Sequence, residues 1–434
     1  MSAARLLYLL LGVALLVLVV AIWIPGLAFA AFVLDLLILL ALVADNALTP
    51  PAKLISAQRF SNERLSIGRK NDLLLEVYSQ AAIPVKVQLR DSFPAALDVD
   101  VQEFEFTLAP SSKASLEYSL LPRRRGAYEF GSIYLRYRSR LGLFWRHLQF
   151  PAAKQIKVYP DLKALQELSV KLAHSSELGV LKVRKRGQGT DFASLREYVN
   201  GDDLRSMDWK ATARHDRPVL RVYEVEKEQT LMVLVDAGRM MVSDLEGLSR
   251  FDHALNAALS LVLTGLMRGD TVGLGIFADK PLLFMPPRRG KTYLNRILEA
   301  CSDLEPSMVE PDYMGALSFF AAAQKSRSLM VLISDLTDPT GSASLLSGLA
   351  SLSPRHLPFC VTLRDREVDR ISEESADTVT GIMKRAVASD LITQRELAFS
   401  HLVRRGCLLL DCPPQDLSSR LVDKYLEIKA RGLL

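Results

Sequence analysis

Carboxylates that follow short apolar runs are the first residues of this chain with a possible chemical role. In the C-terminal half, four such runs are followed by Asp236, Asp279, Asp335 and Asp365. Carboxylate oxygens suit a hard divalent cation, and a pair of carboxylates can also act as acid and base in hydrolysis. The sequence fixes no two of them at a working distance, so these two uses stay open.

Other residue types lack the spacing that their chemistry needs. The six histidines are scattered and the four cysteines form no CxxC pair, so we expect no zinc site. Gly290-Lys291-Thr292 resembles the end of a phosphate-binding loop, but Met285 stands where that motif needs its first glycine. No histidine accompanies a nucleophile in a known motif, so we expect no catalytic residues and no enzyme.

The most densely charged stretch, residues 186–228, holds eight basic and nine acidic side chains in 43 positions. These charges nearly cancel, which argues against a nucleic acid as partner. Apolar residues at helical spacing distinguish the stretch from a disordered charge run. They predict one helix around Leu195 and Val199 and a second around Leu204 and Ala211.

Local signals predict where the second of these helices begins and ends. Asp202 or Asp203 is placed to cap its start, and Pro218 ends it. Residues 219–226 then predict a strand. We interpret 186–228 as a folded, ion-paired junction between two domains.

The elements that position these residues begin with two apolar runs. Residues 6–24 and 27–44 are each long enough to span a bilayer as a helix, and a Pro-Gly break separates them. We expect a transmembrane helical hairpin rather than a cleaved signal peptide, because the first run exceeds a signal core and a second follows at once. Asp35, near the middle of the second run, is costly in lipid and has no assigned role.

Basic residues after these runs predict an orientation and a partner. Lys53, Arg59 and Arg64 follow the second run, so the positive-inside rule places the large C-terminal part in the cytoplasm. Residues 51–160 carry 17 basic and 10 acidic side chains. This excess suits contact with the anionic headgroups of a lipid bilayer, with a solvated basic surface as the alternative.

Two further domains follow from periodicity. Between about 55 and 160, short runs that alternate apolar and polar residues predict an all-β sandwich. From 229 to 434, apolar strands alternate with helical stretches, which predicts an α/β (Rossmann-like) domain with a mostly parallel sheet. Its expected strands are 231–235, 272–277, 329–333, 359–363 and 407–410, and its expected helices are 251–267, 293–301, 314–324, 382–403 and 417–430.

Residues 186–228 closely resemble the signature of a bacterial family, the domain of unknown function 58 (DUF58). The matching positions are Arg186, Gly187, Gly189, Asp191-Phe192, Ser194–Tyr198, Gly201–Asp203, Arg205 and Asp208–Arg214. The resemblance extends to the layout of two N-terminal spans, a β-domain and a C-terminal domain similar to a von Willebrand factor A domain. It implies a protein of the bacterial inner membrane with no defined biochemical activity and a MoxR-type AAA+ ATPase as partner.

A von Willebrand factor A domain often holds Mg²⁺ through a DxSxS loop, a threonine and a further aspartate. Here the loop reads Asp236-Ala-Gly238-Arg-Met240, so both serine positions lack a side-chain oxygen. Asp335 stands for the further aspartate, and residues 311–315 offer no threonine. We therefore expect a degenerate site without cofactor, in which Asp236 and Asp335 make structural hydrogen bonds or pair with Arg239. Weak Mg²⁺ binding is the alternative.

Together these patterns predict a multidomain, multi-pass and non-enzymatic adaptor of the bacterial inner membrane. The expected parts are a transmembrane hairpin (1–48), a β-sandwich (55–160), the signature junction (161–228) and the von Willebrand factor A-like domain (229–434). The residues expected to face a partner or hold the junction are Arg186, Asp191, Arg196, Asp203, Asp208, Trp209, Lys210 and Arg214. An Mg²⁺-dependent ligand-binding module is the first alternative, and a hydrolase that uses the acidic strand ends is the second.

Overall fold

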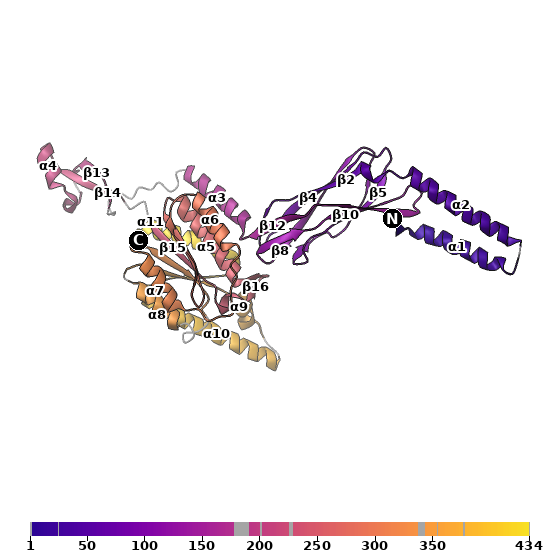
Figure 1. The fold of residues 1–434 in the computed structure, drawn as a ribbon. Helices are drawn as coiled ribbons and strands as arrows, with labels where there is room; N and C mark the ends of the chain where they lie inside the picture. Colours follow the sequence, from indigo (N-terminus) through magenta and orange to yellow (C-terminus); the bar gives the residue numbers. More distant parts are fainter. Residues whose placement is uncertain are drawn as a thin grey trace. The chain divides into compact units, whose positions relative to one another are not determined.

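The fold is given by a computed structural model, which describes residues 2–24, 26–177, 191–199, 202–224, 229–336, 343–353, 355–375 and 378–433. The chain divides into two compact units, Met1–Tyr159 and Pro160–Leu434. The first holds two apolar helices and a set of β-sheets, and the second holds an α/β sheet with helices on both faces (Figure 1).

Two helices without interior proline follow the first short strand. Helix α1 (Arg5–Ala21) and helix α2 (Leu27–Leu48) pack together through Leu7, Ala14 and Ile38. Among the described residues, the helical stretch Leu27–Leu54 is the one long and apolar enough to cross a membrane, and α1 is an apolar helix of 17 residues. Asp35 lies on the exposed surface of α2.

The β-rich part of the first unit contains sheets of five, four and three strands, in the orders β1-β11-β10-β5-β7, β2-β4-β8-β6 and β3-β12-β9. The strands are β1 (Ser2–Ala3), β2 (Ile55–Phe60), β3 (Arg64–Ser66), β4 (Asn71–Ser79), β5 (Val85–Asp91), β6 (Leu97–Val99), β7 (Phe104–Leu108), β8 (Lys113–Pro122), β9 (Gly126–Phe130), β10 (Ile133–Arg138), β11 (Phe144–Phe150) and β12 (Lys154–Tyr159). Burial alternates along β5 and β10, as expected of strands with one face against a core.

A buried ion pair joins the two larger sheets. Arg59 of β2 donates from Nε to Asp91 of β5 at 2.8 Å, and both side chains are almost fully buried. Tyr118 of β8 donates to the same carboxylate at 2.5 Å. Because the pair links the four-stranded sheet to the five-stranded one, it supports a β-sandwich. Arg59, expected to follow the membrane spans as a basic flank, thus lies inside the β-rich part.

The end of α2 is attached to the turn between β10 and β11. The Asp45 side chain is buried and accepts the backbone N–H groups of Leu141 (2.7 Å) and Leu143 (3.2 Å). Arg146 of β11 donates to the Asn46 side chain at 2.6 Å and to the Pro50 carbonyl at 2.9 Å. The β-rich part and the apolar helices are therefore connected by polar contacts as well as by the chain.

The second unit is built on a six-stranded sheet in the order β19-β18-β15-β20-β21-β22, in which β19 alone runs antiparallel to its neighbour. Its strands are β15 (Thr230–Asp236), β18 (Thr271–Phe277), β19 (Pro281–Arg288), β20 (Leu329–Ile333), β21 (Leu357–Leu363) and β22 (Leu408–Cys412), with a small ribbon of β16 (Asp244–Leu245) and β17 (Leu248–Ser249) beside it. Its helices are α3 (Leu162–Glu177), α5 (Arg250–Met267), α6 (Thr292–Cys301), α7 (Tyr313–Ala323), α8 (Ala343–Leu352), α9 (Arg366–Glu373), α10 (Val379–Arg404) and α11 (Pro414–Arg431).

Each face of this sheet has its own apolar core. Leu231, Val233 and Val235 of β15 point into a cluster with α5, α6 and α11, whereas Met232 and Leu234 point into a second cluster with α7 and α8. Alternate residues of one strand thus serve both layers, which explains why the central strands are continuous apolar runs. The five strands and five helices expected between 229 and 434 all occur, with ends that differ by a few residues.

Candidate functional site

The centre of the six-stranded sheet places polar side chains at one edge. Strand β15 lies between β18 and β20, so the strand order reverses there, and sheets of this class bind ligands beyond the carboxyl ends of such strands. Asp236 ends β15, and Ser334 and Asp335 directly follow β20. All three residues are buried.

Asp236 accepts hydrogen bonds on both carboxylate oxygens. Oδ1 accepts the backbone N–H of Gly238 at 2.7 Å. Oδ2 accepts the hydroxyls of Ser334 at 2.7 Å and Tyr313 at 2.8 Å. Burial raises the pKa of Asp236, and these three donors act in the opposite direction. The carboxylate therefore stabilises the strand end rather than facing solvent.

Asp335 is held between two arginines. Arg250, at the start of α5, donates from Nη1 to Asp335 Oδ2 and from Nη2 to Asp365 at 3.2 Å. Arg395, from the middle of α10, donates from Nη1 to Asp335 Oδ1 at 3.0 Å. Burial raises the pKa of Asp335, and the two guanidinium groups oppose that rise.

Arg395 also binds groups on two neighbouring strands. Its Nη2 donates to the Leu363 carbonyl and to Asp411 Oδ1, both at 2.7 Å, and Nη1 donates to the Leu336 carbonyl at 3.1 Å. One side chain thus connects α10 to the ends of β20, β21 and β22. We call Arg250, Arg395 and Asp335 the arginine clamp.

The residues at this edge do not fit a divalent cation. Both oxygens of Asp236 and both of Asp335 already accept protein donors, and two guanidinium groups supply positive charge beside Asp335. Mg²⁺ would need those oxygens in a near-octahedral shell and would be repelled by the arginines. Over the ranges that the structure describes, no cluster of three or more His, Cys, Asp or Glu side chains could hold a metal ion.

Asp236 and Asp335 make structural hydrogen bonds, but the expected pairing with Arg239 is wrong. Arg239 instead forms an ion pair with Glu310. Asp335 finds its cations in Arg250 and Arg395, two residues that we did not identify from the sequence. Residues 311–315 offer no threonine, but they contain Tyr313. Its phenol donates a hydrogen bond to Asp236.

The sequence did carry one signal for Arg395. It lies at helical spacing from Ala388, Ala398 and Leu402, which are the buried residues of α10. An arginine in the middle of the buried face of a helix needs a buried anion. No comparable local signal identifies Arg250, because only the fold brings the start of α5 beside β20.

The charged signature forms a second structure, between residues 191 and 224. The helix expected around Leu195 is wrong: β13 (Asp191–Glu197) pairs antiparallel with β14 (Val219–Glu224). The expected second helix is shorter and divided, into a 3-10 turn over Leu204–Ser206 and α4 (Trp209–His215). The strand expected over 219–226 is confirmed over the residues that are described.

Ion pairs and helix caps hold this segment together. Arg196 pairs with Asp202, and its Nη1 lies 2.7 Å from the carboxylate. Asp203 accepts the N–H of Arg205, and Asp208 accepts the N–H groups of Lys210 and Ala211. These contacts are local.

Asp208 also pairs with Arg221 at 2.9 Å, so it connects α4 to β14. The Arg196 and Arg221 guanidinium groups lower the pKa values of Asp202 and Asp208, respectively. Lys210 and Arg214 have no ionic partner within the described residues. Arg186 lies outside the described residues, and Asp191 is described only through its backbone in β13.

Large apolar side chains are exposed on the same segment. Trp209 is 71% exposed, Val199 62%, Leu204 60% and Leu195 42%. Exposed apolar groups of this size between charged residues are typical of contact surfaces between proteins. We call these four residues the apolar surface of the signature.

A family model, described as protein of unknown function DUF58, matches residues 194–381. Residues 194–381 are therefore similar to the DUF58 family. This region includes Trp209, Asp236 and Asp335, whereas Arg395 lies beyond its end. The DUF58 region therefore holds the apolar surface of the signature and the acidic edge of the sheet, but only one of the two arginines that occupy that edge.

Several proteins similar to this chain are uncharacterised. One from Mycobacterium tuberculosis is 25% identical over 211 residues, which are 47% of this chain and 64% of that protein. YeaD of Bacillus subtilis is 23% identical over 185 residues, which are 42% of this chain and 44% of that protein. The match therefore spans less than two thirds of the length of these relatives.

Similar solved structures include the SpRpn10 VWA domain, which is 15% identical with a TM-score of 0.30 and covers 45% of this chain and 94% of that domain. The protein BatB of Bacteroides thetaiotaomicron is 13% identical with a TM-score of 0.31 and covers 47% of this chain and 99% of that one.

Proposed function

We propose that this protein is a membrane-attached, non-enzymatic adaptor that binds other proteins through its signature segment. The partner proposed first is a MoxR-type AAA+ ATPase, together with the client of that ATPase, at the bacterial inner membrane. The observation that carries the proposal is the apolar surface of the signature, Leu195, Val199, Leu204 and Trp209, exposed within a segment tied together by its own ion pairs.

The chemistry of this surface suits a protein partner. Tryptophan supplies a large contact area at a small entropic cost and is enriched among the residues that dominate binding energy. Lys210 and Arg214 lie on the same short helix as Trp209 and have no ionic partner within the described residues, so they are available to carboxylates of a partner.

The occupied acidic edge supports a role without catalysis. Asp236 and Asp335 are buried and hydrogen-bonded to protein groups, so neither offers a free oxygen to a substrate or to water. A general base must reach the proton that it removes, within hydrogen-bond distance or through one water. Calorimetry of the full chain in detergent should show no heat of Mg²⁺ binding at millimolar concentration, and a saturable signal would favour the metal-dependent module instead.

Membrane attachment is supported by the apolar helices. Residues 27–54 include a helix of suitable length and composition, and α1 adds a second apolar surface beside it. Tyr8 and Trp23, near the two ends of α1, are 65% and 85% exposed, as expected of aromatic side chains at the two interfaces of a bilayer. We propose that both helices cross the membrane, with the second unit in the cytoplasm.

The partner proposal is tested by capture of the purified MoxR-type ATPase of the same organism on the immobilised full chain. Trp209→Ala should weaken capture about thirtyfold, the effect of removing about 2 kcal/mol from a dominant contact. Met308→Ala is the matched control, because Met308 is 77% exposed and lies outside the signature. Unchanged capture by folded Trp209→Ala and Lys210→Ala variants would refute a recognition role for this segment.

A further inference from the structure

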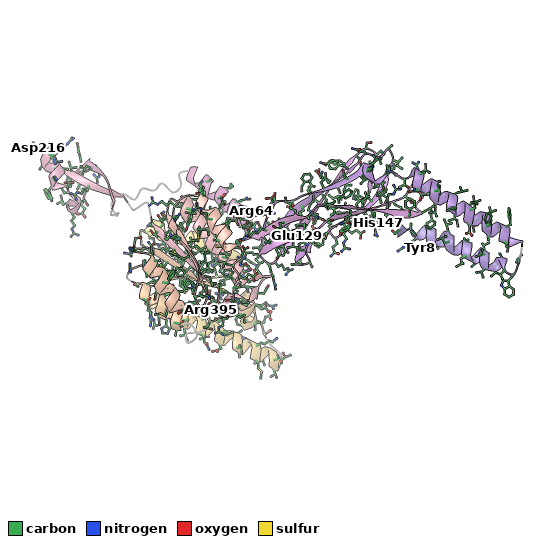
Figure 2. All side chains as sticks on the ribbon, viewed as in Figure 1. Tyr8, Arg64, Glu129, His147, Asp216 and Arg395 are labelled. Carbon is green, nitrogen blue, oxygen red and sulfur yellow. The ribbon has the colours of Figure 1, made fainter. Side chains whose placement is uncertain are left out.

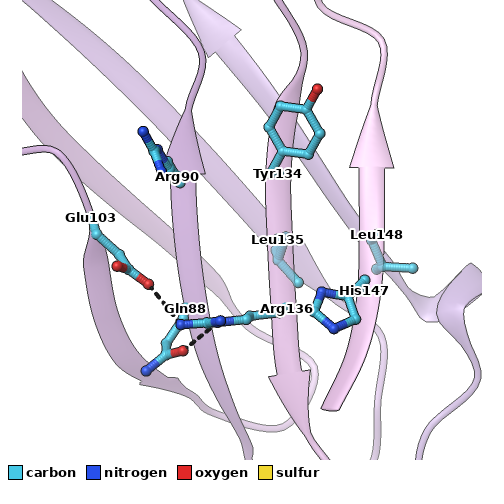
Figure 3. Close-up of a pocket in the computed structure, with 8 residues that line it drawn as sticks. All are labelled: Gln88, Arg90, Glu103, Tyr134, Leu135, Arg136, His147 and Leu148. Carbon is cyan, nitrogen blue, oxygen red and sulfur yellow. Dashed lines mark hydrogen bonds and ion pairs between the residues drawn. The ribbon is translucent and has the colours of Figure 1, made fainter. Parts of the chain in front are cut away.

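The outer face of the five-stranded sheet in the first unit gathers cations and aromatic rings. Alternate residues of neighbouring strands share this face, because Arg136 of β10 is registered with Gln88 of β5 and with His147 of β11, and Tyr134 is registered with Arg90. Figure 3 shows these side chains together over β5, β10 and β11. They border a shallow cavity of about 240 Å³, which is lined by Gln88, Arg90, Glu103, Tyr134, Leu135, Arg136, His147 and Leu148.

Positive charge on this face is only partly neutralised. Arg136 donates to Gln88 at 2.5 Å and to Glu103 at 3.3 Å, and Lys86 pairs with Glu105. These two pairs leave the charges of Arg90 and Arg138 uncompensated. Neither of these arginines has a hydrogen-bond or ionic partner for its side chain among the described residues, and both are exposed. The face therefore has a net charge of about +2 and two arginines free to bind an anion.

This face is continuous with the apolar helices. Strand β1 pairs with β11, with Ser2 opposite Trp145 and Ala3 opposite Phe144, and α1 begins two residues later at Arg5. The Ser2 hydroxyl lies 2.8 Å from His147 Nε2. Figure 2 shows His147 and Tyr8 near the end of the β-rich part from which the apolar helices extend, and Arg64 and Glu129 at its other end.

The register sets the spacing of the cations from the helix. Arg138 is opposite Trp145, which is itself opposite Ser2, so it lies level with Ser2, three residues before the start of α1 at Arg5. Arg136 and Tyr134 follow at two and four residues along β10, about 7 and 13 Å further from α1. The headgroup layer of a bilayer is roughly 5–8 Å thick on each side of the hydrocarbon core. Arg138 is therefore the arginine of this face nearest to the headgroups when α1 lies in the membrane, and Arg136 is the next.

We propose that the outer face of β5, β10 and β11 binds the headgroup of an anionic phospholipid, with Arg136 and Arg138 around the phosphate and Trp145 beside it, and with Arg90 and Tyr134 further out on the same face. The proposal rests on the membrane attachment proposed above. A lipid is favoured over free phosphate because the open face adjoins an apolar helix and carries aromatic rings, which prefer the membrane interface. The arginine-rich turn at Arg123–Arg125 is a weaker candidate, since Arg123 pairs with Asp98 and Arg125 is buried.

The test uses the full chain in nanodiscs that contain phosphatidylglycerol and phosphatidylcholine with identical acyl chains. Native mass spectrometry then measures which lipid stays bound to the released protein. We expect preferential retention of phosphatidylglycerol. Removing one basic residue near a membrane surface weakens binding about fivefold, so the double variant Arg136→Gln/Arg138→Gln should lower this preference about 25-fold.

The control variant Arg123→Gln/Arg124→Gln removes the same charge from the other cluster and should retain the preference. Equal retention of the two lipids by the unaltered chain, or equal losses in the two double variants, would overturn the proposal. Loss of phosphatidylglycerol upon addition of inorganic phosphate alone would assign the face to free anions instead. A chain that does not enter phosphatidylcholine nanodiscs at all would refute membrane attachment itself, which separates the two failures.

Discussion

Arg395→Met tests whether the arginine clamp holds the second unit together. Methionine keeps most of the volume of the buried stem and removes the guanidinium group. Asp335 would keep Arg250 as its single cationic partner, and the Leu336 and Leu363 carbonyls would each lose a donor. The variant therefore leaves a buried carboxylate partly uncompensated, which costs far more than an exposed ion pair.

The expected loss of unfolding free energy follows from the burial of the Arg395–Asp335 pair. Breaking a buried pair by removing one partner costs about 3–5 kcal/mol, and the remaining contact with Arg250 places this variant at about 3–4 kcal/mol. For a unit of this size each 1 kcal/mol lowers Tm by about 2–4 °C, so the expected decrease is about 6–16 °C. The exposed pair Arg364–Asp369 supplies the control, because Arg364→Met should cost less than about 1 kcal/mol.

The assay is urea unfolding of the full chain in detergent, followed by far-ultraviolet circular dichroism for the helices and by hydrogen exchange for β20, β21 and β22. Hydrogen exchange assigns the lost stability to this unit, since a chain of several domains need not unfold in one step. Adding Asp335→Asn to Arg395→Met should restore part of the loss, because it removes the uncompensated charge. A loss of unfolding free energy no larger than that of Arg364→Met would refute a stabilising role of the arginine clamp. So would the absence of any recovery of stability in the double variant.

Three further variants allow direct tests. Tyr313→Phe removes one donor from Asp236 and should lower the unfolding free energy by about 1–2 kcal/mol, measured by urea unfolding; no change would show that the phenol is dispensable. Because burial raises the pKa of Asp236, its contribution to stability is present at low pH and is lost as pH rises through that raised value. Asp236→Asn should flatten this dependence of stability on pH above the ordinary pKa of an aspartate, and an unaltered profile would contradict the assignment. Asp45→Ala should speed hydrogen exchange at Leu141 and Leu143 in the full chain, whereas unchanged protection would mean that other contacts hold the turn.

Periodicity was sufficient for the parallel strands of the six-stranded sheet and insufficient for the signature. Strands such as β15 and β20 are continuous apolar runs with a helix pattern on either side, so their positions follow from the sequence. In β13, a register shift between Phe192 and Ser194 interrupts the alternation, and the remaining apolar spacing is that of a helix. The pairing of β13 with β14 overrides that local pattern.

Several elements of the second unit were not predicted, among them β19, α8 and α9. Strand β19 contains Pro281, Pro286 and Pro287, residues that disfavour a strand unless it lies at an edge, as it does here. Helix α8 is short and helix α9 is polar with no buried residue, so neither has a long amphipathic pattern. Their positions follow from packing rather than from local sequence.

The candidate site was partly visible in the sequence. Asp236 and Asp335 were identified by their place after apolar runs, and the structure shows both carboxylates hydrogen-bonded to protein groups. Arg250 and Arg395 are separated from Asp335 by 85 and 60 positions, so no spacing rule connects them. Long-range ion pairs of this kind become visible only when the fold brings their elements together.

The pairing of β1 with β11 has a consequence for biosynthesis. Ser2 and His147 are 145 positions apart, so at about 5–20 residues per second the ribosome adds β11 roughly 7–30 s after the first strand. During that interval Ser2 and Ala3 have no sheet to join, while α1 and α2 have already been made. The five-stranded sheet can therefore close only after the apolar helices have emerged, and the edge of the β-rich part that adjoins α1 is completed late.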